Sequence, residues 1–311
     1  MTGPGPFPRR VPAPAFLAAA LLVAVLIPTP PDLACASGPE GEAVCPPPWE
    51  IRYSDRSPAQ GEPVLVEFLA GAGTDTVAIG WKGRRFPMKK AGEGLFAGLI
   101  GIDVMDAPGD ITVAFLVSGE GIACRVEDVL TVRKRRFPVQ RLSLPAEMAE
   151  FDPATVARIQ QEASRLNERL SAAPSPPAWD LPMVPPVADF RPVGFGARRI
   201  INGEPRSPHA GVDISLPEGT PVTSIADGAV VFAGTQFFGG NSVVVDHGGG
   251  LFSIYYHLKE FSVSEGQRVS RGECIGAVGA SGRAVGPHLH FGVRAAGGRV
   301  DPALLFGLAP H

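Results

Sequence analysis

The stretch G-P-H-L-H-F-G-V-R, residues 286–294, places two of the chain's six histidines one residue apart. Side chains alternate between the two faces of a β-strand, so in a strand His288 and His290 project from the same face. Two imidazoles on one face can hold a metal ion or move a proton. An isolated H-x-H pair is more often two surface histidines on an edge strand. Other parts of the sequence are therefore needed to distinguish a functional pair from two surface residues.

The region around this stretch has the pattern of a β-domain. From about Phe190 to the C-terminus, short strands rich in Val, Ile and Ala alternate with glycine turns, and this region contains every histidine. A weak internal echo, E-G-T-P-V at 218–222 and E-G-Q-R-V at 265–269, indicates either repeated turn chemistry or a duplicated barrel-sandwich unit. Lys259 does not lie at a hairpin tip, which argues against a carrier domain. We expect an antiparallel β-domain over residues 190–305.

Two further segments carry polar groups at strand spacing. In P-H-A-G-V-D-I-S, His209 and Asp213 are four residues apart, which predicts both on one strand face, where they can share one ion. In S-I-Y-Y-H-L, alternation predicts that His257 lies on the more polar face. His247, in the turn sequence D-H-G-G-G, is expected to face solvent. The C-terminal His311 is expected to be mobile, so neither is a ligand candidate.

These residues match the donor set of a catalytic zinc site. Such a site has three protein ligands of the histidine or carboxylate type and one position open to water. His209, Asp213 and one member of the His288/His290 pair meet that count. The remaining histidines are then available for proton transfer, which is needed because the chain has no H-E-x-x-H motif. The absence of C-x-x-C excludes a thiolate zinc site.

At these residues the sequence resembles the LytM/lysostaphin-type zinc endopeptidases, which cut peptidoglycan peptides. The resemblance covers roughly residues 190–302. It is carried by four segments: F-G-A-R-R-I-I-N-G at 195–203, H-x-G-x-D at 209–213, D-H-G-G-G-L-F-S-I-Y-Y-H-L at 246–258 and G-R-A-V-G-P-H-L-H-F at 282–291. It implies an antiparallel β core of the lysostaphin-type or barrel-sandwich hybrid kind, with the site in a groove.

The resemblance also implies a role for each candidate residue. It makes His209, Asp213 and His290 the ligands of one Zn²⁺. It makes His257 and His288 a catalytic pair that does not touch the metal, without saying which is the general base. The expected substrate is the peptide part of peptidoglycan, and the linkage that is cut is not indicated.

Some positions depart from the family pattern. They are Ser281 where threonine is common, Ala284-Val285 where Ser-Thr is common, and Gly292 where glutamate often follows the phenylalanine. These positions flank the site, so they bear on substrate preference more than on the chemistry. The alternative function is a non-catalytic relative that binds cell wall or activates an amidase. Such relatives typically lose metal ligands, whereas this chain keeps all three and both catalytic histidines.

The N-terminal half predicts a second β-domain over residues 45–135. Apolar residues alternate in runs such as 64–68 and 111–117, with A-P-G-D and G-E-G as turns, which predicts a small Ig-like sandwich. It has no ligand-spaced cluster, so we expect an accessory role in targeting, spacing or covering the other domain. The run R-K-R-R at 133–136 is interpreted as a solvated strand end, with contact to an anionic envelope polymer as the alternative.

Three cysteines follow the first 36 residues. Cys45 and Cys124 bracket the N-terminal β-domain, and we expect them to pair as a disulfide; the alternative is two unpaired buried thiols. Cys274, in the apolar sequence around C-I-G-A-V-G, is expected to be a free thiol and a small core residue.

A helix and a stiff connector link the two β-domains. The sequence at 152–170 predicts a linker helix within residues 150–172, with Asp152 as N-cap and Pro153 at the first helical position. Its apolar stripe is too short for an independent coiled coil, so we expect it to dock on a domain. Six prolines in residues 173–189 predict an extended connector.

Residues 1–36 have the layout of a signal peptide. Two arginines precede an apolar run at 15–27, which is too short to span a bilayer comfortably, and A-C-A at 34–36 offers a cleavage site. Lipidation at Cys35 is the alternative, but Asp32 stands where lipoproteins usually carry an apolar residue. We therefore expect a periplasmic or extracellular protein with no stable membrane span after cleavage.

The overall charge gives no sign of a nucleic-acid partner. Twenty-eight Lys and Arg against 31 Asp and Glu give a net charge of −3, without the basic excess that phosphate backbones favour. Apart from peptidoglycan, the sequence indicates no particular divisome or envelope partner.

Overall fold

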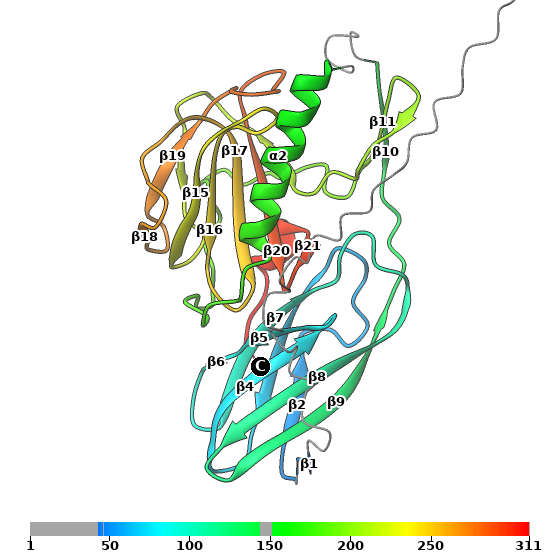
Figure 1. Ribbon diagram of the computed structural model, residues 1–311, viewed down its shortest axis with the longest axis vertical. Coiled ribbons are helices and arrows are strands. Elements are labelled where there is room, and N and C mark those ends of the chain that lie inside the picture. The colour runs from blue at the N-terminus through cyan, green and yellow to red at the C-terminus, as the bar shows by residue number, and fades with distance from the viewer. Residues whose placement is uncertain (1–42, 46, 144–150, 311) are drawn as a thin grey trace, which may run out of the picture. The chain divides into compact units, whose positions relative to one another are not determined.

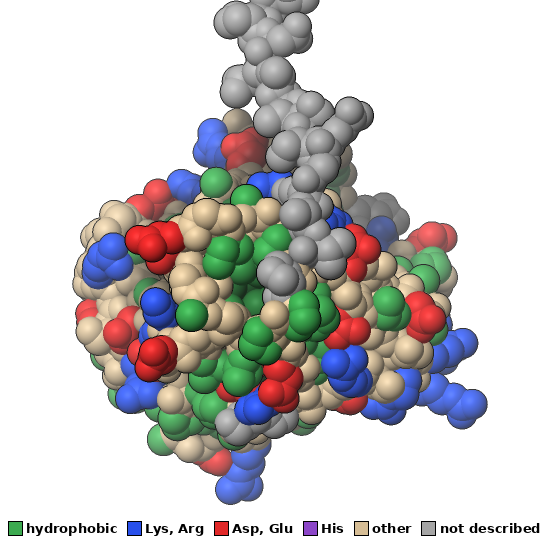
Figure 2. All heavy atoms as spheres, turned by 90° about the horizontal axis from the view of Figure 1, so that it is seen from below, with side chains coloured by type: hydrophobic (Ala, Val, Ile, Leu, Met, Phe, Trp, Pro, Cys, Tyr) green, Lys and Arg blue, Asp and Glu red, His purple; other side chains and the backbone are tan. Residues whose placement is uncertain are grey.

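The computed structural model describes residues 43–45, 47–143 and 151–310, and the fold is mainly β (Figure 1). The expected fold class is confirmed. The predicted signal peptide, the alternative lipidation site and His311 lie outside the described residues. Within the described ranges, no helix is long and apolar enough to cross a membrane. Figure 2 shows one face of the molecule, on which acidic and basic side chains are interspersed.

Two sheets of the N-terminal half enclose one apolar core. One sheet has the strand order β1-β9-β8-β4-β5 and the other β2-β3-β7-β6. Their bounds are β1 (Ala43–Val44), β2 (Glu50–Tyr53), β3 (Pro63–Leu69), β4 (Thr74–Trp81), β5 (Arg84–Pro87), β6 (Lys89–Lys90), β7 (Leu95–Gly101), β8 (Gly109–Gly119) and β9 (Ile122–Val132). Phe68 of β3 and Phe115 of β8 meet in this core, with their ring centroids 5.1 Å apart. The two-sheet arrangement agrees with the expected sandwich, and its Ig-like character stays a prediction.

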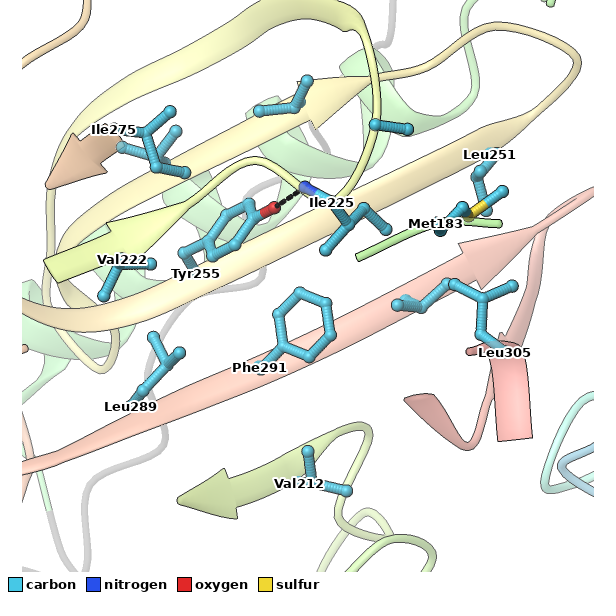
Figure 3. Close-up of a cluster of buried hydrophobic side chains, with 14 of the residues drawn as sticks. Met183, Val212, Val222, Ile225, Leu251, Tyr255, Ile275, Leu289, Phe291 and Leu305 are labelled. Carbon is cyan, nitrogen blue, oxygen red and sulfur yellow. Dashed lines mark hydrogen bonds between the residues drawn. The ribbon is translucent and has the colours of Figure 1, made fainter. Parts of the chain in front are cut away.

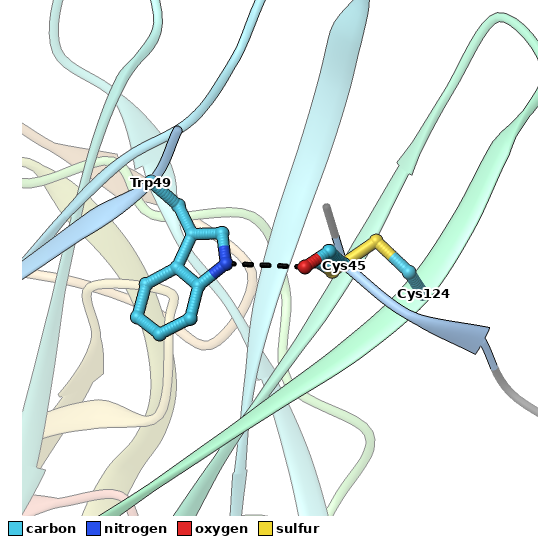
Figure 4. The surroundings of a disulfide bond; sticks show 3 residues. All are labelled: Cys45, Trp49 and Cys124. Atoms are coloured by element: carbon cyan, nitrogen blue, oxygen red, sulfur yellow. Dashed lines mark hydrogen bonds between the residues drawn. A yellow bond between two sulfur atoms is a disulfide. The ribbon is translucent and has the colours of Figure 1, made fainter. Parts of the chain in front are cut away.

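A disulfide joins the start of this region to β9. Cys45 and Cys124 are bonded, which confirms the expected pairing, and Trp49 Nε1 donates a hydrogen bond of 3.2 Å to the Cys45 carbonyl (Figure 4). Cys274 is free, as expected. The expectation that it is a core residue is wrong: Cys274 is exposed at the start of its strand, and Ile275 takes the buried face.

Removing the disulfide is expected to destabilise the protein strongly. The bond closes a loop with a sequence separation of 79, and in the chain-entropy model such a loop is worth about 4.5 kcal/mol. The double variant Cys45→Ala/Cys124→Ala should lose about that much free energy of unfolding in urea, whereas the exposed Cys274→Ser should change it little. Thiol counting in denaturant should find one free thiol in a chain lacking residues 1–36. Three thiols, or an equally stable double variant, would contradict the pairing.

The linker helix forms as predicted. It is α2 (Pro153–Leu170), and the Asp152 carboxylate accepts from the amides of Ala154 and Thr155. In the ribbon diagram, α2 runs along the C-terminal sheet (Figure 1). Leu166 and Leu170 pack against an apolar cluster on one face of this sheet, composed of Val231, Phe232, Val244, Phe252, Ile254 and Tyr256. The expectation that the helix docks rather than forming a coiled coil is confirmed.

The proline-rich connector is also held against the C-terminal domain. The amide of Gly249 donates to the Ser175 carbonyl, and the amide of Val184 donates to the Ile225 carbonyl, at 2.8 and 3.0 Å. Trp179 and Met183 are buried in the domain core. The connector is therefore part of the fold and not a loose tether.

A nine-stranded sheet forms the C-terminal domain. Its main path is β13-β20-β17-β16-β15-β18, with β14 paired to β19, β19 to β17 and β21 to β20. The bounds are β13 (Val212–Ser215), β14 (Pro221–Thr223), β15 (Gly228–Gln236), β16 (Gly240–Asp246), β17 (Leu251–Phe261), β18 (Arg268–Val269), β19 (Cys274–Val278), β20 (His288–Ala295) and β21 (Gly298–Val300). A smaller sheet combines β10 (Val139–Leu142), β11 (Arg198–Ile201) and β12 (Glu204–Pro205), and α3 (Pro302–Leu305) follows β21.

The inner face of the nine-stranded sheet carries the domain core. Leu289 and Phe291 of β20 are fully buried beside Tyr255 of β17 and the side chains of β14 and β19 (Figure 3). The Tyr255 hydroxyl accepts a hydrogen bond of 3.3 Å from the amide of Ile225, so this polar group is satisfied within the core. The core holds β20 rigidly between β13 and β17.

Candidate metal centre

Strand β20 presents the histidine pair. Its residues alternate as predicted, with Leu289 and Phe291 buried in the core and His288 and His290 on the opposite face. The register places Asp213 of β13 directly across from His290. Tyr256 of β17 is paired with His290 on the other side, and the two rings stack with centroids 5.4 Å apart. The pairing of β20 with β13 thus places His290 beside the carboxylate of Asp213.

His209 lies beside Asp213 and His290, but not on the strand that was expected to carry it. It precedes β13 in an irregular segment, so the prediction that one strand carries both His209 and Asp213 is wrong. Its amide donates to the Ala197 carbonyl, and its own carbonyl accepts from the amide of Gly196, both at 2.9 Å. Gly211 permits the close approach of this segment to β20, because a Cβ there would lie 2.4 Å from the Phe291 carbonyl oxygen.

His209, Asp213 and His290 converge on one point. Asp213 Oδ1 lies 3.1 Å from His209 Nε2 and 2.9 Å from His290 Nδ1, and the two nitrogens are 2.9 Å apart. The donor atoms of a tetrahedral zinc site are separated by roughly 3.3 Å, given metal-ligand bonds of about 2.0–2.1 Å. The three side chains therefore lie close enough together that they could hold one metal ion, and we call them the metal-binding group.

The surroundings of this group favour a charged Asp213 carboxylate and a neutral His290 imidazole. Burial would raise the pKa of Asp213, but hydrogen bonds and charges from His209 and His290 outweigh it and hold the pKa well below its usual range. Burial lowers the pKa of His290, although its hydrogen bond to Asp213 opposes the shift. A deprotonated carboxylate and neutral imidazoles are the forms that bind metal.

His257 lies beside the metal-binding group because β17 is irregular. Its φ of 63° is in the left-handed region, which is uncommon for a residue other than glycine, and its amide donates to the Gly239 carbonyl at 2.7 Å. The register between β16 and β17 shifts near this point. The predicted polar face of β17 is wrong, since Tyr255 on that face is in the core. The irregularity moves His257 toward His288, with ring centroids 4.6 Å apart.

The tautomers of these histidines follow from their backbone contacts. Nδ1 of His209, His257 and His288 lies 2.8–2.9 Å from the carbonyls of Gly194, Ser281 and Gly286 respectively. A carbonyl can only accept, so each Nδ1 carries the hydrogen and each Nε2 presents a lone pair. Burial lowers the pKa of His257 to about 4, so its ring is neutral near pH 7.

His247 does not face solvent, so that expectation is wrong. It lies in the turn between β16 and β17 and is fully buried. Its Nδ1 donates to the Asp227 carbonyl at 2.9 Å, and its Nε2 accepts from the Ser253 hydroxyl at 2.7 Å. Both ring nitrogens are satisfied within the fold, which makes His247 a structural residue and supports its exclusion from the metal-binding group.

His247 is expected to make stability depend on pH. Burial lowers its pKa to about 4, whereas histidine in an unfolded chain titrates near about 6.5. Between these pH values the unfolded state binds a proton at His247 that the folded state does not bind. The contribution of His247 to the free energy of unfolding is therefore fully present above about pH 6.5 and decreases as the pH falls toward about 4. Urea unfolding measured across this pH range should show that the free energy of unfolding changes more steeply with pH for the natural protein than for His247→Gln. The difference in slope should be up to about 1.4 kcal/mol per pH unit. Parallel curves would refute this assignment.

The region that contains the candidate metal centre is similar to a known protein family. Residues 207–302 match the family model described as Peptidase family M23. The chain is 46% identical over 94 residues, 30% of its length and 22% of the relative's, to the DD-carboxypeptidase/endopeptidase Mpg of Neisseria meningitidis serogroup B. It is 46% identical over 85 residues, 27% of its length and 20% of the relative's, to the peptidoglycan DD-endopeptidase ShyA of Vibrio cholerae serotype O1. The matched segment thus spans about a fifth of these curated relatives.

A solved structure resembles a larger part of the chain. The crystal structure of a candidate peptidase M23 from Pseudomonas aeruginosa aligns with a TM-score of 0.63 and 28% identity, over 81% of this chain and 96% of that one. The C-terminal region therefore belongs to peptidase family M23, and the resemblance to the LytM/lysostaphin-type endopeptidases is confirmed.

Proposed function

We propose that the protein is an exported zinc metalloendopeptidase that hydrolyses amide bonds in the peptide part of peptidoglycan. The observation that carries this proposal is the convergence of His209, Asp213 and His290 beside the His257/His288 pair in an M23 domain. Relatives of that domain are named peptidoglycan DD-endopeptidases, which supports the substrate class.

The donor set fits zinc. Two imidazole nitrogens and one carboxylate oxygen, without a thiolate, are a typical ligand set for catalytic zinc. The hydrogen bond from His209 Nδ1 to the Gly194 carbonyl orients Nε2 toward the group, as supporting contacts do in metal sites. When bound there, zinc supplies a Lewis acid that polarises a carbonyl and makes water acidic enough to react near neutral pH.

The catalytic pair is assigned to proton transfer. His257 and His288 are anchored through Nδ1, so Nε2 of each can exchange a proton with water, with the amide carbonyl oxygen or with the departing amine. In the reaction, water adds its oxygen to the carbonyl carbon and the C–N bond breaks. The water protons pass to the new amine and to bulk solvent. A protonated member of the pair can also donate a hydrogen bond to the carbonyl oxygen as negative charge develops.

The proposal places the protein in the cell envelope. The predicted signal peptide at residues 1–36 supports export to the periplasm or beyond, and the Cys45–Cys124 disulfide is typical of an oxidising compartment. Residues 45–135 are assigned as an accessory domain, residues 150–172 and 173–189 as linker helix and connector, and residues 190–305 as the peptidase domain.

Digestion of purified peptidoglycan tests this proposal. The zinc-loaded chain lacking residues 1–36 should release fragments whose masses show one new amine and one new carboxyl group at a single peptide linkage. The same chain treated with a chelator is the control and should release none. Absence of cleavage by the zinc-loaded, folded chain would overturn the enzymatic function and favour the non-catalytic alternative.

A further inference from the structure

Three arginines lie on segments next to the candidate metal centre. Arg199 lies on β11, Arg206 directly follows β12, and Arg283 lies in the segment between β19 and β20. The amide of Arg206 donates to the Arg199 carbonyl at 2.8 Å, so these two residues face each other across the β11–β12 hairpin. The chain as a whole has a net charge of −3, so this concentration of positive charge is local.

Arg199 reaches the metal-binding group directly. Its Nη2 lies 3.6 Å from Asp213 Oδ2, the oxygen that does not face the two histidines. Its Nε is buried and has no hydrogen-bond partner among the described residues. The guanidinium therefore forms one ion pair at the site, and its Nε still lacks an acceptor.

Arg283 belongs to the segment that contacts His257 and His288, and its side chain packs on two aromatic rings. Its guanidinium carbon lies 5.6 Å from the ring centroids of both Phe151 and Phe238, and its amide donates to the Phe238 carbonyl at 3.0 Å. The same segment supplies the carbonyls of Ser281 and Gly286 that orient His257 and His288. The side chain is thus placed before any ligand arrives.

The charge of Arg283 is not neutralised within the described part of the chain. No described carboxylate forms an ion pair with Arg283 or Arg206, and Arg283 Nη2 is buried without a hydrogen-bond partner. Partial burial and the charges of Arg206 and Arg199 lower the pKa of Arg283. An anion placed between these groups would relieve their repulsion and accept from the unpaired donors.

We propose that Arg283 and Arg199 bind a free carboxylate on a residue that flanks the scissile amide of the substrate. The inference rests on the proposed peptidase function and narrows its substrates to peptides that are anionic next to the cut. Guanidinium groups match carboxylates in geometry as well as charge, which lysine does only in part. Arg206 contributes positive charge from across the hairpin.

Matched synthetic peptides test the inference. Within each pair, one peptide carries a free carboxylate and the other carries the corresponding neutral primary amide. In the first pair this group lies on the carbonyl side of the scissile bond, and in the second pair it lies on the amine side. The zinc-loaded natural protein should prefer the carboxylate on one side by about 10- to 100-fold in kcat/KM, the effect of hydrogen bonds to one charged group. Arg283→Gln should bring that preference close to unity, and Arg283→Lys should retain part of it.

A control variant and a binding measurement separate the outcomes. Arg268→Gln changes an exposed arginine of β18 and should keep the preference. Calorimetry with metal-free protein and the carboxylate-bearing product peptide should show the same preference in binding, and its loss in Arg283→Gln. Hydrolysis with an unchanged preference in Arg283→Gln would overturn the inference alone. Failure of the natural protein to hydrolyse any peptide would overturn the proposed function, and the binding measurement would still decide the inference.

Discussion

Replacement of His290 by alanine is expected to abolish zinc binding and peptide hydrolysis together. His290 Nδ1 lies within 2.9 Å of both Asp213 Oδ1 and His209 Nε2, so its loss leaves two of three ligands. Loss of a supporting partner already costs about 10- to 100-fold in metal affinity, and loss of a ligand should cost more. Zinc content after dialysis against buffer, measured beside turnover of peptidoglycan, checks this result. Circular dichroism excludes unfolding as the cause.

The neighbouring histidine provides a matched control, because it lies two residues away on the same strand. His288→Ala should keep its zinc under the same dialysis, since His288 Nε2 is 4.0 Å from Asp213 Oδ1 and outside the metal-binding group. If His288→Ala loses zinc while His290→Ala keeps it, the roles within the pair are reversed. If both variants keep zinc and full activity, the site lies elsewhere.

Loss of either member of the catalytic pair is expected to slow hydrolysis by about 10² to 10⁴ while zinc stays bound. This is the range found for a positioned acid-base group or an oxyanion donor. His257→Ala and His288→Ala should resemble each other, because their rings lie side by side with anchored Nδ1 atoms. Single-turnover rates with zinc-loaded variants are the measurement. A variant with bound zinc and the natural rate would remove that histidine from the mechanism.

Features that depend on local physics were predictable from the sequence. Alternation along a regular strand placed His288 and His290 on one face, and the Asp-Pro start of α2 predicted its first turn. The mainly β class follows from short Val- and Ile-rich runs between glycine turns. In each case the controlling interactions lie within a few residues of one another, so a single sequence contains them.

Strand alternation did not predict the position of His209, because alternation holds only where the backbone is extended. The segment before β13 forms hydrogen bonds with Gly196 and Ala197, and these contacts set its path. The convergence of His209 with Asp213 still occurs, because the loop returns to the edge of β20. The spacing of His209 and Asp213 therefore predicted a shared site correctly, although the two residues do not lie on one strand.

His257 and His247 show how tertiary contacts override a pattern. The left-handed backbone at His257 accompanies a hydrogen bond to Gly239, which belongs to the turn before β16. His247 is buried because Asp227 and Ser253, from other elements, satisfy both ring nitrogens. Neither partner can be recognised from the residues beside the histidine, so the turn sequence alone suggested exposure.

The arginines near the site were missed for the same reason. Arg199 on β11 and Arg283 between β19 and β20 are far apart in sequence, so no local pattern relates them. The segment at 195–203 carries part of the family resemblance and also contains basic residues. Two adjacent arginines there were the one signal available.

A zinc-edge anomalous difference map from crystals of the zinc-loaded protein tests the central claim most directly. We expect one strong peak at bonding distance from His209 Nε2, Asp213 Oδ1 and His290 Nδ1, with metal-nitrogen distances of about 2.0–2.1 Å. His257 and His288 should lie nearby without bonding to the metal. A peak held by His257 or His288 instead, or no peak at this group in folded, zinc-loaded protein, would contradict the account.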